Sequence, residues 1–257
     1  MSHISFSALK VWNDCPFKFK LIYEDEVKKF SGSEYTAFGT ALHEAAELKV
    51  QDDSVNEVEV FLNKFDSEIK ILKENSSKVD DKLLTQMRKQ GEDLSIQILP
   101  ALRSHFGEFK VLAAEEDIYE AVESLPELNY SFKGFIDLII QTSENKIHII
   151  DWKSCAWGWD AKKKSDAMTT YQLTFYKYFY AKKHGIDPKN IETHFALLKR
   201  TPKKDNIEIF RVTSGAVKTK NAFNLLEKAL YNINKKMFPK NKLNCKNCEF
   251  KNTTHCP

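Results

Sequence analysis

The stretch NYSFKGFIDLIIQTSENKIHIIDWKS, residues 129–154, decides the fold that this sequence predicts. Both halves are rich in β-branched and aromatic residues, which favour strands, and TSEN at 142–145 has the composition of a tight turn. The stretch therefore predicts a β-hairpin. Each apolar run, FKGFID and KIHIID, ends on an aspartate, although burying a charge is costly unless it is paired.

The hairpin places three charged side chains within reach of one another. Alternation along a strand sends Asp151 and Lys153 to the same face, and a suitable register brings Asp137 beside them from the neighbouring strand. Carboxylate oxygens are the ligands that Mg²⁺ prefers, and a nearby lysine can orient water or stabilise charge on a phosphate. The pattern is typical of phosphodiester hydrolysis, and a salt-bridged strand edge is the structural alternative.

The rest of the chain predicts an α/β core with a helical front. Helices are expected over 34–50, over 55–72 with Ser54 and Glu57 as a capping box, and over 80–105. A strand over 109–122 precedes the hairpin, and a helix over 166–185, two strands and a last helix follow it. We expect one domain over 1–257, made of a mainly helical part (1–107), an α/β core (108–238) and a cysteine-rich tail (239–257).

Composition narrows the class of protein. The chain has 257 residues, 42% of them hydrophobic, and a net charge of +3, as in ordinary soluble domains. The totals alone do not indicate nucleic acid. No apolar run is long enough to cross a bilayer, and the first residues lack the apolar core of a signal peptide. We therefore expect a cytoplasmic protein with no membrane partner, in which cysteines stay reduced.

The cysteines gather in the tail LNCKNCEFKNTTHCP, residues 243–257. Cys245, Cys248 and Cys256 are three soft ligands on a short polar segment, a metal site that lacks one ligand. Cys15 or His255 can supply the fourth. Spacing alone leaves zinc and an iron–sulfur cluster equally open. The remaining cysteine, Cys155, is interpreted as an ordinary thiol.

Two further motifs flank the hairpin, GTALH at 39–43 and QLTFY at 172–176. Together with GFID and DWK they occur in the order of the PD-(D/E)XK nuclease superfamily, and the chain resembles its RecB-like branch over residues 39–176. The resemblance implies a restriction-endonuclease-like α/β fold, a mixed central sheet flanked by helices. HEAAE at 43–47 lacks the second histidine of a zinc-protease helix, so it does not compete with this interpretation.

The resemblance also implies roles for individual residues. His43, Asp137, Asp151 and the main-chain carbonyl of Trp152 would hold Mg²⁺ or Mn²⁺, and Lys153 would be catalytic. Gln172 and Tyr176 would contact DNA or support the site. Glu115 matches an acidic residue on the preceding strand, with Glu116 as the alternative.

The cysteine pattern is similar to that of AddB-type nucleases and of the iron–sulfur nuclease associated with CRISPR adaptation. In these proteins a [4Fe–4S] cluster staples the two chain ends around the nuclease core. The resemblance therefore implies a cluster on Cys15, Cys245, Cys248 and Cys256, with zinc as the alternative metal.

Aromatic and basic residues follow the hairpin. Trp157, Trp159, Lys162 and Lys163 suit single-stranded nucleic acid, in which bases stack and phosphates need cations, while the core is the other place for the tryptophans. The resemblance implies a DNA exonuclease that acts on ends in recombination, repair or phage genome processing, with a recombination or single-strand-binding protein as a further partner. The alternative is a non-catalytic iron–sulfur or zinc DNA-binding module. Polarity, strand preference and oligomeric state are not predicted.

Overall fold

The fold is known from a computed structural model, which describes residues 2–27, 32–75, 79–202 and 204–257. The chain forms two compact units that interleave along the sequence. The first unit comprises Met1–Phe30, Asp117–Gly134 and Ser214–Pro257, and the second comprises Ser31–Glu116 and Phe135–Thr213.

The second unit is built on a mixed sheet. Strand β3 runs antiparallel to β4, β4 runs parallel to β5, and β5 runs antiparallel to β6. Strand β2 also pairs with β3, and both of these strands extend into the first unit. The predicted hairpin is confirmed as β3 and β4. The strands are β2 (Phe109–Ala121), β3 (Tyr130–Thr142), β4 (Ile147–Cys155), β5 (Ile191–Lys199) and β6 (Ile207–Val212).

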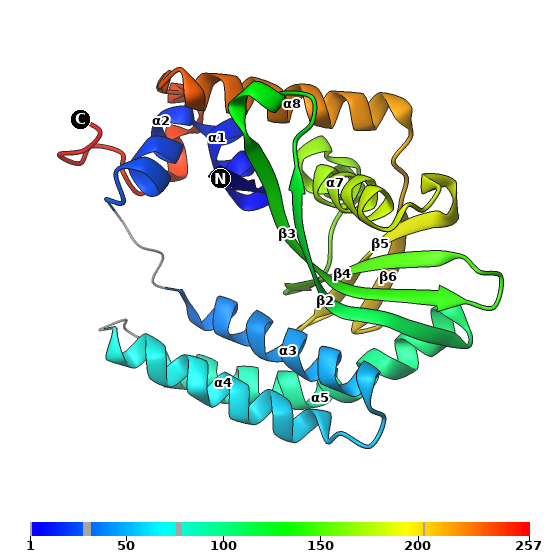
Figure 1. The fold of residues 1–257 in the computed structure, drawn as a ribbon. Helices are drawn as coiled ribbons and strands as arrows, with labels where there is room; N and C mark the ends of the chain where they lie inside the picture. The colour runs from blue at the N-terminus through cyan, green and yellow to red at the C-terminus, as the bar shows by residue number, and fades with distance from the viewer. Residues whose placement is uncertain (1, 28–31, 76–78, 203) are drawn as a thin grey trace. The chain divides into compact units, whose positions relative to one another are not determined.

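Helices cover both faces of this sheet (Figure 1). Helices α3, α4 and α5 pack on one another and reach β4 and β6, whereas α7 packs on β4 and β5. This arrangement is the predicted α/β fold class, with a mixed sheet flanked by helices. The helices are α3 (Glu34–Gln51), α4 (Glu57–Glu74), α5 (Asp81–Phe106), α6 (Ala161–Ser165), α7 (Ala167–His184) and a 3₁₀ turn at Pro188–Asn190.

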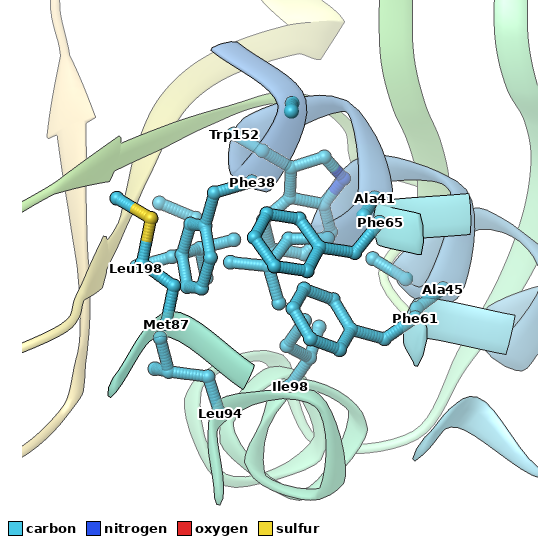
Figure 2. Packing of buried hydrophobic residues seen from close by; sticks show 14 of the residues in the cluster. Phe38, Ala41, Ala45, Phe61, Phe65, Met87, Leu94, Ile98, Trp152 and Leu198 are labelled. Carbon is cyan, nitrogen blue, oxygen red and sulfur yellow. The ribbon is translucent and has the colours of Figure 1, made fainter. Parts of the chain in front are cut away.

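An aromatic core joins the helical layer to the sheet. Phe38 of α3 meets the rings of Phe61 and Phe65 of α4 edge to face, and Trp152 of β4 lies in the same cluster with 1% of its surface exposed. Figure 2 shows these rings interleaved with Met87, Leu94 and other aliphatic side chains. The tryptophan of the DWK motif therefore anchors its strand in the core, and only its main chain is available to the site.

Gly91 of α5 is required by this packing, and we expect Gly91→Ala to destabilise the protein. An added methyl group would overlap the ring of Phe61, which is fully buried. Alanine stabilises a helix by about 1 kcal/mol relative to glycine. Overpacking of a closed core, however, costs about 1–3 kcal/mol and at times more. Urea denaturation should therefore show a lower free energy of unfolding.

The neighbouring exposed position provides the control for this substitution. Lys89→Ala removes a surface ion pair with Asp93 and should change stability by less than about 0.5 kcal/mol. An unchanged or higher stability of Gly91→Ala would contradict the described contact between α4 and α5.

One predicted helix start is wrong. Ser54 does not cap α4, because its amide and hydroxyl both donate to Asp52 Oδ1 at 2.9 and 2.7 Å in a local turn. Asn56 is the cap instead, accepting from the Glu59 amide at 3.3 Å. Both residues are good caps, and the tertiary path of the loop, which the sequence does not show, selects the later one.

The first unit joins the two ends of the chain. Strand β1 pairs in parallel with the beginning of β3 from Ser2↔Tyr130 to Ser5↔Lys133, and α1 contacts α8. No helix of the described residues is both long and apolar enough to cross a membrane. The elements are β1 (Ser2–Ser5), α1 (Phe6–Asp14), α2 (Pro16–Phe19), a π-helical turn (Lys20–Glu24), α8 (Ala216–Asn234), and 3₁₀ turns at Pro126–Leu128 and Lys242–Asn247.

Candidate active site

The site begins where β3 and β4 separate. The ladder between them ends here at the pair Leu138↔Ile150, so the next step of the register places Asp137 opposite Asp151. The main-chain amide of Trp152 donates to Asp137 Oδ2 at 2.8 Å. The carboxylate thus binds a backbone donor at the divergence of the strands, and this fixes its orientation.

Asp151 and Lys153 form an ion pair on the same face of β4. Lys153 Nζ lies 2.5 Å from Asp151 Oδ2, which has no hydrogen bond of good geometry to any described residue. Burial raises the pKa of Asp151 to about 6, against the opposing charge of Lys153. Burial lowers the pKa of Lys153, but the carboxylates of Asp151 and Asp137 more than reverse this, so the pKa is raised.

Helix α7 supports Asp151 from the other side. Gln172 Nε2 donates to Asp151 Oδ1 at 2.8 Å and lies 3.1 Å from the Tyr176 hydroxyl. Their spacing of four residues puts both side chains on one face of the helix. Burial raises the pKa of Tyr176, so its hydroxyl stays neutral. The QLTFY motif therefore orients the aspartate.

Helix α3 brings His43 to the site. His43 Nδ1 lies 3.4 Å from Asp137 Oδ1. Burial lowers the pKa of His43, and the charge of Asp137 with its hydrogen bond more than reverses this, so the pKa is raised. Gly39, one turn earlier, lets the helix approach β4, because a Cβ there would lie 3.2 Å from Ser154 Oγ. In the GTALH motif, Gly39 thus permits close packing of the helix on β4, and His43 contacts Asp137.

Glu115 and Glu116 of β2 point to different environments. Glu115 has a φ of +57° inside its strand, a left-handed conformation that is uncommon for a residue with a side chain and clusters at functional sites. It lines a cavity with His43 and Asp137. Glu116 instead pairs with Lys183 at 2.7 Å and His184 at 3.1 Å.

That cavity, of about 320 Å³, is strongly acidic. Lys64, paired with Glu44 at 3.1 Å, is the only lysine or arginine among its described lining residues. Burial, and then the charges of Glu115 and Glu44, raise the pKa of Glu47. This excess of carboxylate oxygens fits a divalent cation. The lining residues are Thr40, His43, Glu44, Glu47, Lys64, Glu115, Asp137 and Trp152.

Four of these residues were missed by the sequence interpretation. Thr40, Glu44 and Glu47 lie on α3 within one turn of His43, so helical spacing from the histidine was a usable signal for them. Lys64 comes from α4, and nothing in the sequence connects it to the site.

The structure separates the two tryptophans that follow the DWK motif. Trp159 packs on the rings of Phe195 and Phe210, with centroids 5.1 and 6.1 Å away, and Lys163 Nζ lies 4.7 Å above it. Trp157 is 76% exposed. Lys162 and Lys163 lie on the short helix α6, which Asp160 caps. Of the two rings, Trp157 is thus the one more open to solvent or a ligand.

The cysteines of the first unit lie around a second cavity. Cys15, Cys245, Cys248 and Cys256 all line a space of about 620 Å³. The chain ends are held there by polar contacts: Asn241 N donates to Cys15 Sγ at 3.3 Å, and the side-chain amides of Asn241 and Asn244 donate to Asp14 O at 2.9 and 2.6 Å. His255 does not line this cavity, and Cys155 belongs to the second unit.

Comparison with known proteins gives a family and a fold relative. The sequence model of the PD-(D/E)XK nuclease superfamily matches residues 3–256. A solved structure from Eubacterium rectale, named provisionally as an exonuclease, is 12% identical and has a TM-score of 0.60 over 96% of this chain and 86% of its own. At that identity the likeness shows the fold alone. A second structure, SSO0001, is 14% identical over 91% of each chain, with a TM-score of 0.35. No curated protein sequence matches the chain.

Proposed function

Since the chain belongs to the PD-(D/E)XK nuclease superfamily, we propose that it is a metal-dependent exonuclease that hydrolyses phosphodiester bonds at DNA ends. The observation that carries the proposal is the convergence of His43, Asp137, Asp151 and Lys153 beside an acidic cavity. Work on DNA ends would place the protein in recombination, repair or phage genome processing.

The proposed roles follow from the contacts. Asp137, Asp151, His43 and the main chain of Trp152 would hold Mg²⁺ or Mn²⁺, which supplies a Lewis acid and an activated water when bound. Asp137 is oriented by the Trp152 amide and Asp151 by Gln172. The ammonium of Lys153, held beside Asp151, would stabilise charge that develops on the scissile phosphate.

Glu115 is proposed as a further member of the metal site. Glu115→Gln should raise the Mn²⁺ concentration needed for half-maximal cleavage by about 10–100-fold, because it removes a charge from the cavity wall. The matched control is Glu116→Gln, whose carboxylate pairs with Lys183 and His184 and whose loss should leave the Mn²⁺ dependence unchanged. If the two variants show the opposite pattern, Glu116 is the site residue.

Trp157 is proposed to stack on a base of the bound strand, and Lys162 and Lys163 to contact its phosphates. Trp157→Ala should weaken binding of single-stranded DNA by about 1–3 kcal/mol, the usual value of one aromatic–base stack. Fluorescence anisotropy with Ca²⁺ in place of Mn²⁺ measures this without turnover. Tyr231→Ala, at an exposed ring of α8, is the control. Equal affinity of Trp157→Ala and the wild type would remove Trp157 from the DNA surface.

We propose that the cysteine cavity holds a [4Fe–4S] cluster. Cys15, Cys245, Cys248 and Cys256 all line one cavity of about 620 Å³. Tetrahedral zinc, with Zn–S bonds of about 2.3 Å, would hold its thiolates about 3.8 Å apart. A cube of four irons binds one thiolate at each of four corners and so separates them further. The gathering of all four thiols around one cavity supports a shared metal centre, and the similarity of the cysteine pattern to that of iron–sulfur nucleases favours the cluster over zinc.

Digestion of end-labelled linear DNA and of closed circular DNA tests the proposed activity. With Mn²⁺, an exonuclease releases nucleotides from the linear substrate and leaves the circle intact. The position of the label that is released first gives the polarity. Nicking of the circle would show an endonuclease, and folded protein that binds DNA but cuts neither substrate would support a non-catalytic binding module.

A further inference from the structure

Three metal-binding side chains share one face of the central sheet, away from the proposed nuclease centre. In the parallel ladder of β4 and β5, His148 is the register partner of Glu192. His194 lies two residues further along β5, so alternation puts it on the same face. Asp151 and Lys153 of β4 are an odd number of residues from His148 and therefore face the opposite side of the sheet.

The ligand atoms of this group, His148, Glu192 and His194, are already close together. His148 Nδ1 lies 3.1 Å from His194 Nε2, and His194 Nε2 lies 4.0 Å from Glu192 Oε2. One donor atom from each of the three residues lies within 4.8 Å of the others. A tetrahedral ion with ligand bonds of about 2.0–2.1 Å separates its donors by about 3.4 Å, so these side chains can bind one ion with small rotations.

The surroundings resemble the supporting contacts of a metal site. Thr142 Oγ1 lies 3.5 Å from Nε2 of His148, the nitrogen that faces away from His194. Arg211 Nη2 lies 3.1 Å from Glu192 Oε1 in an ion pair, whereas Glu192 Oε2 is the oxygen near His194. Metal-binding histidines and carboxylates are normally held in this way by a partner on their second polar atom.

Burial of the two imidazoles also needs an explanation. His148 is 8% exposed and His194 is 3% exposed, and the Phe106 ring packs on both, with centroids 4.9 and 5.0 Å away. His194 Nδ1, the nitrogen that faces away from the group, is buried with no hydrogen-bond partner among the described residues, so His194, unlike His148 and Glu192, lacks a supporting contact on its second polar atom. A hydrogen bond between two neutral rings contributes little to offset that cost, whereas coordination bonds contribute much more.

We propose that His148, Glu192 and His194 form a second metal site, which binds a first-row transition ion of the zinc class and ties β4 to β5. Two imidazoles and one carboxylate suit zinc and its neighbours better than Mg²⁺, which prefers oxygen ligands and water. The site is structural, since the sheet separates it from Asp151 and Lys153. This inference does not depend on the nuclease activity.

Cobalt(II) is the probe for this site, because its visible spectrum reports its ligands. The difference between the spectra of wild type and His194→Gln isolates the ion bound here, since ions at the cysteines or the acidic cavity cancel. The wild type should bind one more Co²⁺ than His194→Gln or Glu192→Gln, and loss of a ligand should weaken this site by at least about 100-fold. The control is His184→Gln, which removes an imidazole paired with a single carboxylate and should keep the signal.

A measurement on the unaltered protein covers the case in which a variant fails to fold. Crystals of the wild type soaked in zinc chloride should give an anomalous difference peak at the zinc edge between His148, Glu192 and His194. The proposal is overturned if folded His194→Gln binds as many Co²⁺ ions as the wild type with the same spectrum. It is also overturned if the soaked crystals show no peak at these side chains.

Discussion

Replacement of Lys153 by alanine is expected to lower the rate of DNA cleavage by about 10²–10⁴-fold while DNA binding is retained. Lys153 Nζ lies 2.5 Å from Asp151 Oδ2 at the end of β4, where a scissile phosphate would meet the acidic cavity. Without the ammonium, negative charge that develops on the phosphate loses its nearest cation. Single-turnover release of an end label with Mn²⁺ measures the effect on chemistry.

The variant also removes the ion-pair partner of Asp151, which is 1% exposed, so a fall in stability must be separated from a fall in rate. Lys183→Ala is the matched control. The side chain of Lys183 is 34% exposed, and its ammonium lies 2.7 Å from Glu116. The side chain of Lys153 is 32% exposed, and its ammonium lies 2.5 Å from Asp151. Thermal unfolding of both variants should show modest losses, and Lys183→Ala should cleave normally. Near-wild-type cleavage by folded Lys153→Ala would contradict the assigned role.

Replacement of Cys248 by serine is expected to remove the proposed [4Fe–4S] cluster of the first unit and to release the C-terminal tail. The tail exposes 92% of Leu243 and buries a single aromatic ring, Phe250, so apolar burial alone holds it weakly. Structural metal sites in small domains contribute about 10–16 kcal/mol of folding free energy. The Cys248→Ser variant, purified without oxygen, should lack the iron and the brown colour expected of the wild type. Residues 239–257 should also lose their resistance to protease.

Cys155→Ser is the control for this experiment. Cys155 is a thiol of the second unit, outside the cavity that the other four cysteines line, and its replacement should change neither the iron content nor the proteolysis pattern. A colourless wild type that contains stoichiometric zinc and no iron would show that the cysteines form a zinc site and not an iron–sulfur cluster. A tail that stays protected in Cys248→Ser would contradict a stapling role for the metal.

Much of the second unit could be predicted because local patterns and tertiary contacts agree there. The apolar runs that end at Asp137 and Asp151 are neighbouring strands, and the GTALH and QLTFY helices bring His43 and Gln172 to them. The fixed spacing in these motifs reflects real contacts. Gly39 permits close packing on Ser154, and Tyr176 lies one turn from Gln172.

What could not be predicted depends on how separate elements pack. Lys64 reaches the acidic cavity only because α4 lies along α3. The group of His148, Glu192 and His194 requires the parallel register of β4 and β5, which no local pattern specifies. Trp157 and Trp159 lie two residues apart in the same loop, yet the Trp157 ring is exposed and the Trp159 ring packs on Phe195. The organisation of residues 1–257 as one domain stays a prediction.

The most direct test of the central proposal is the rate of end-label release from linear DNA as a function of Mn²⁺ concentration, for wild type and Asp137→Asn. Asp137 accepts the Trp152 amide and contacts His43, so the amide side chain keeps the shape of the site and removes its charge. We predict a saturating dependence on Mn²⁺ for the wild type, no release in EDTA, and little release by Asp137→Asn at any Mn²⁺ concentration. Equal release with and without Mn²⁺, or equal release by the two proteins, would contradict a metal-dependent nuclease centred on these carboxylates.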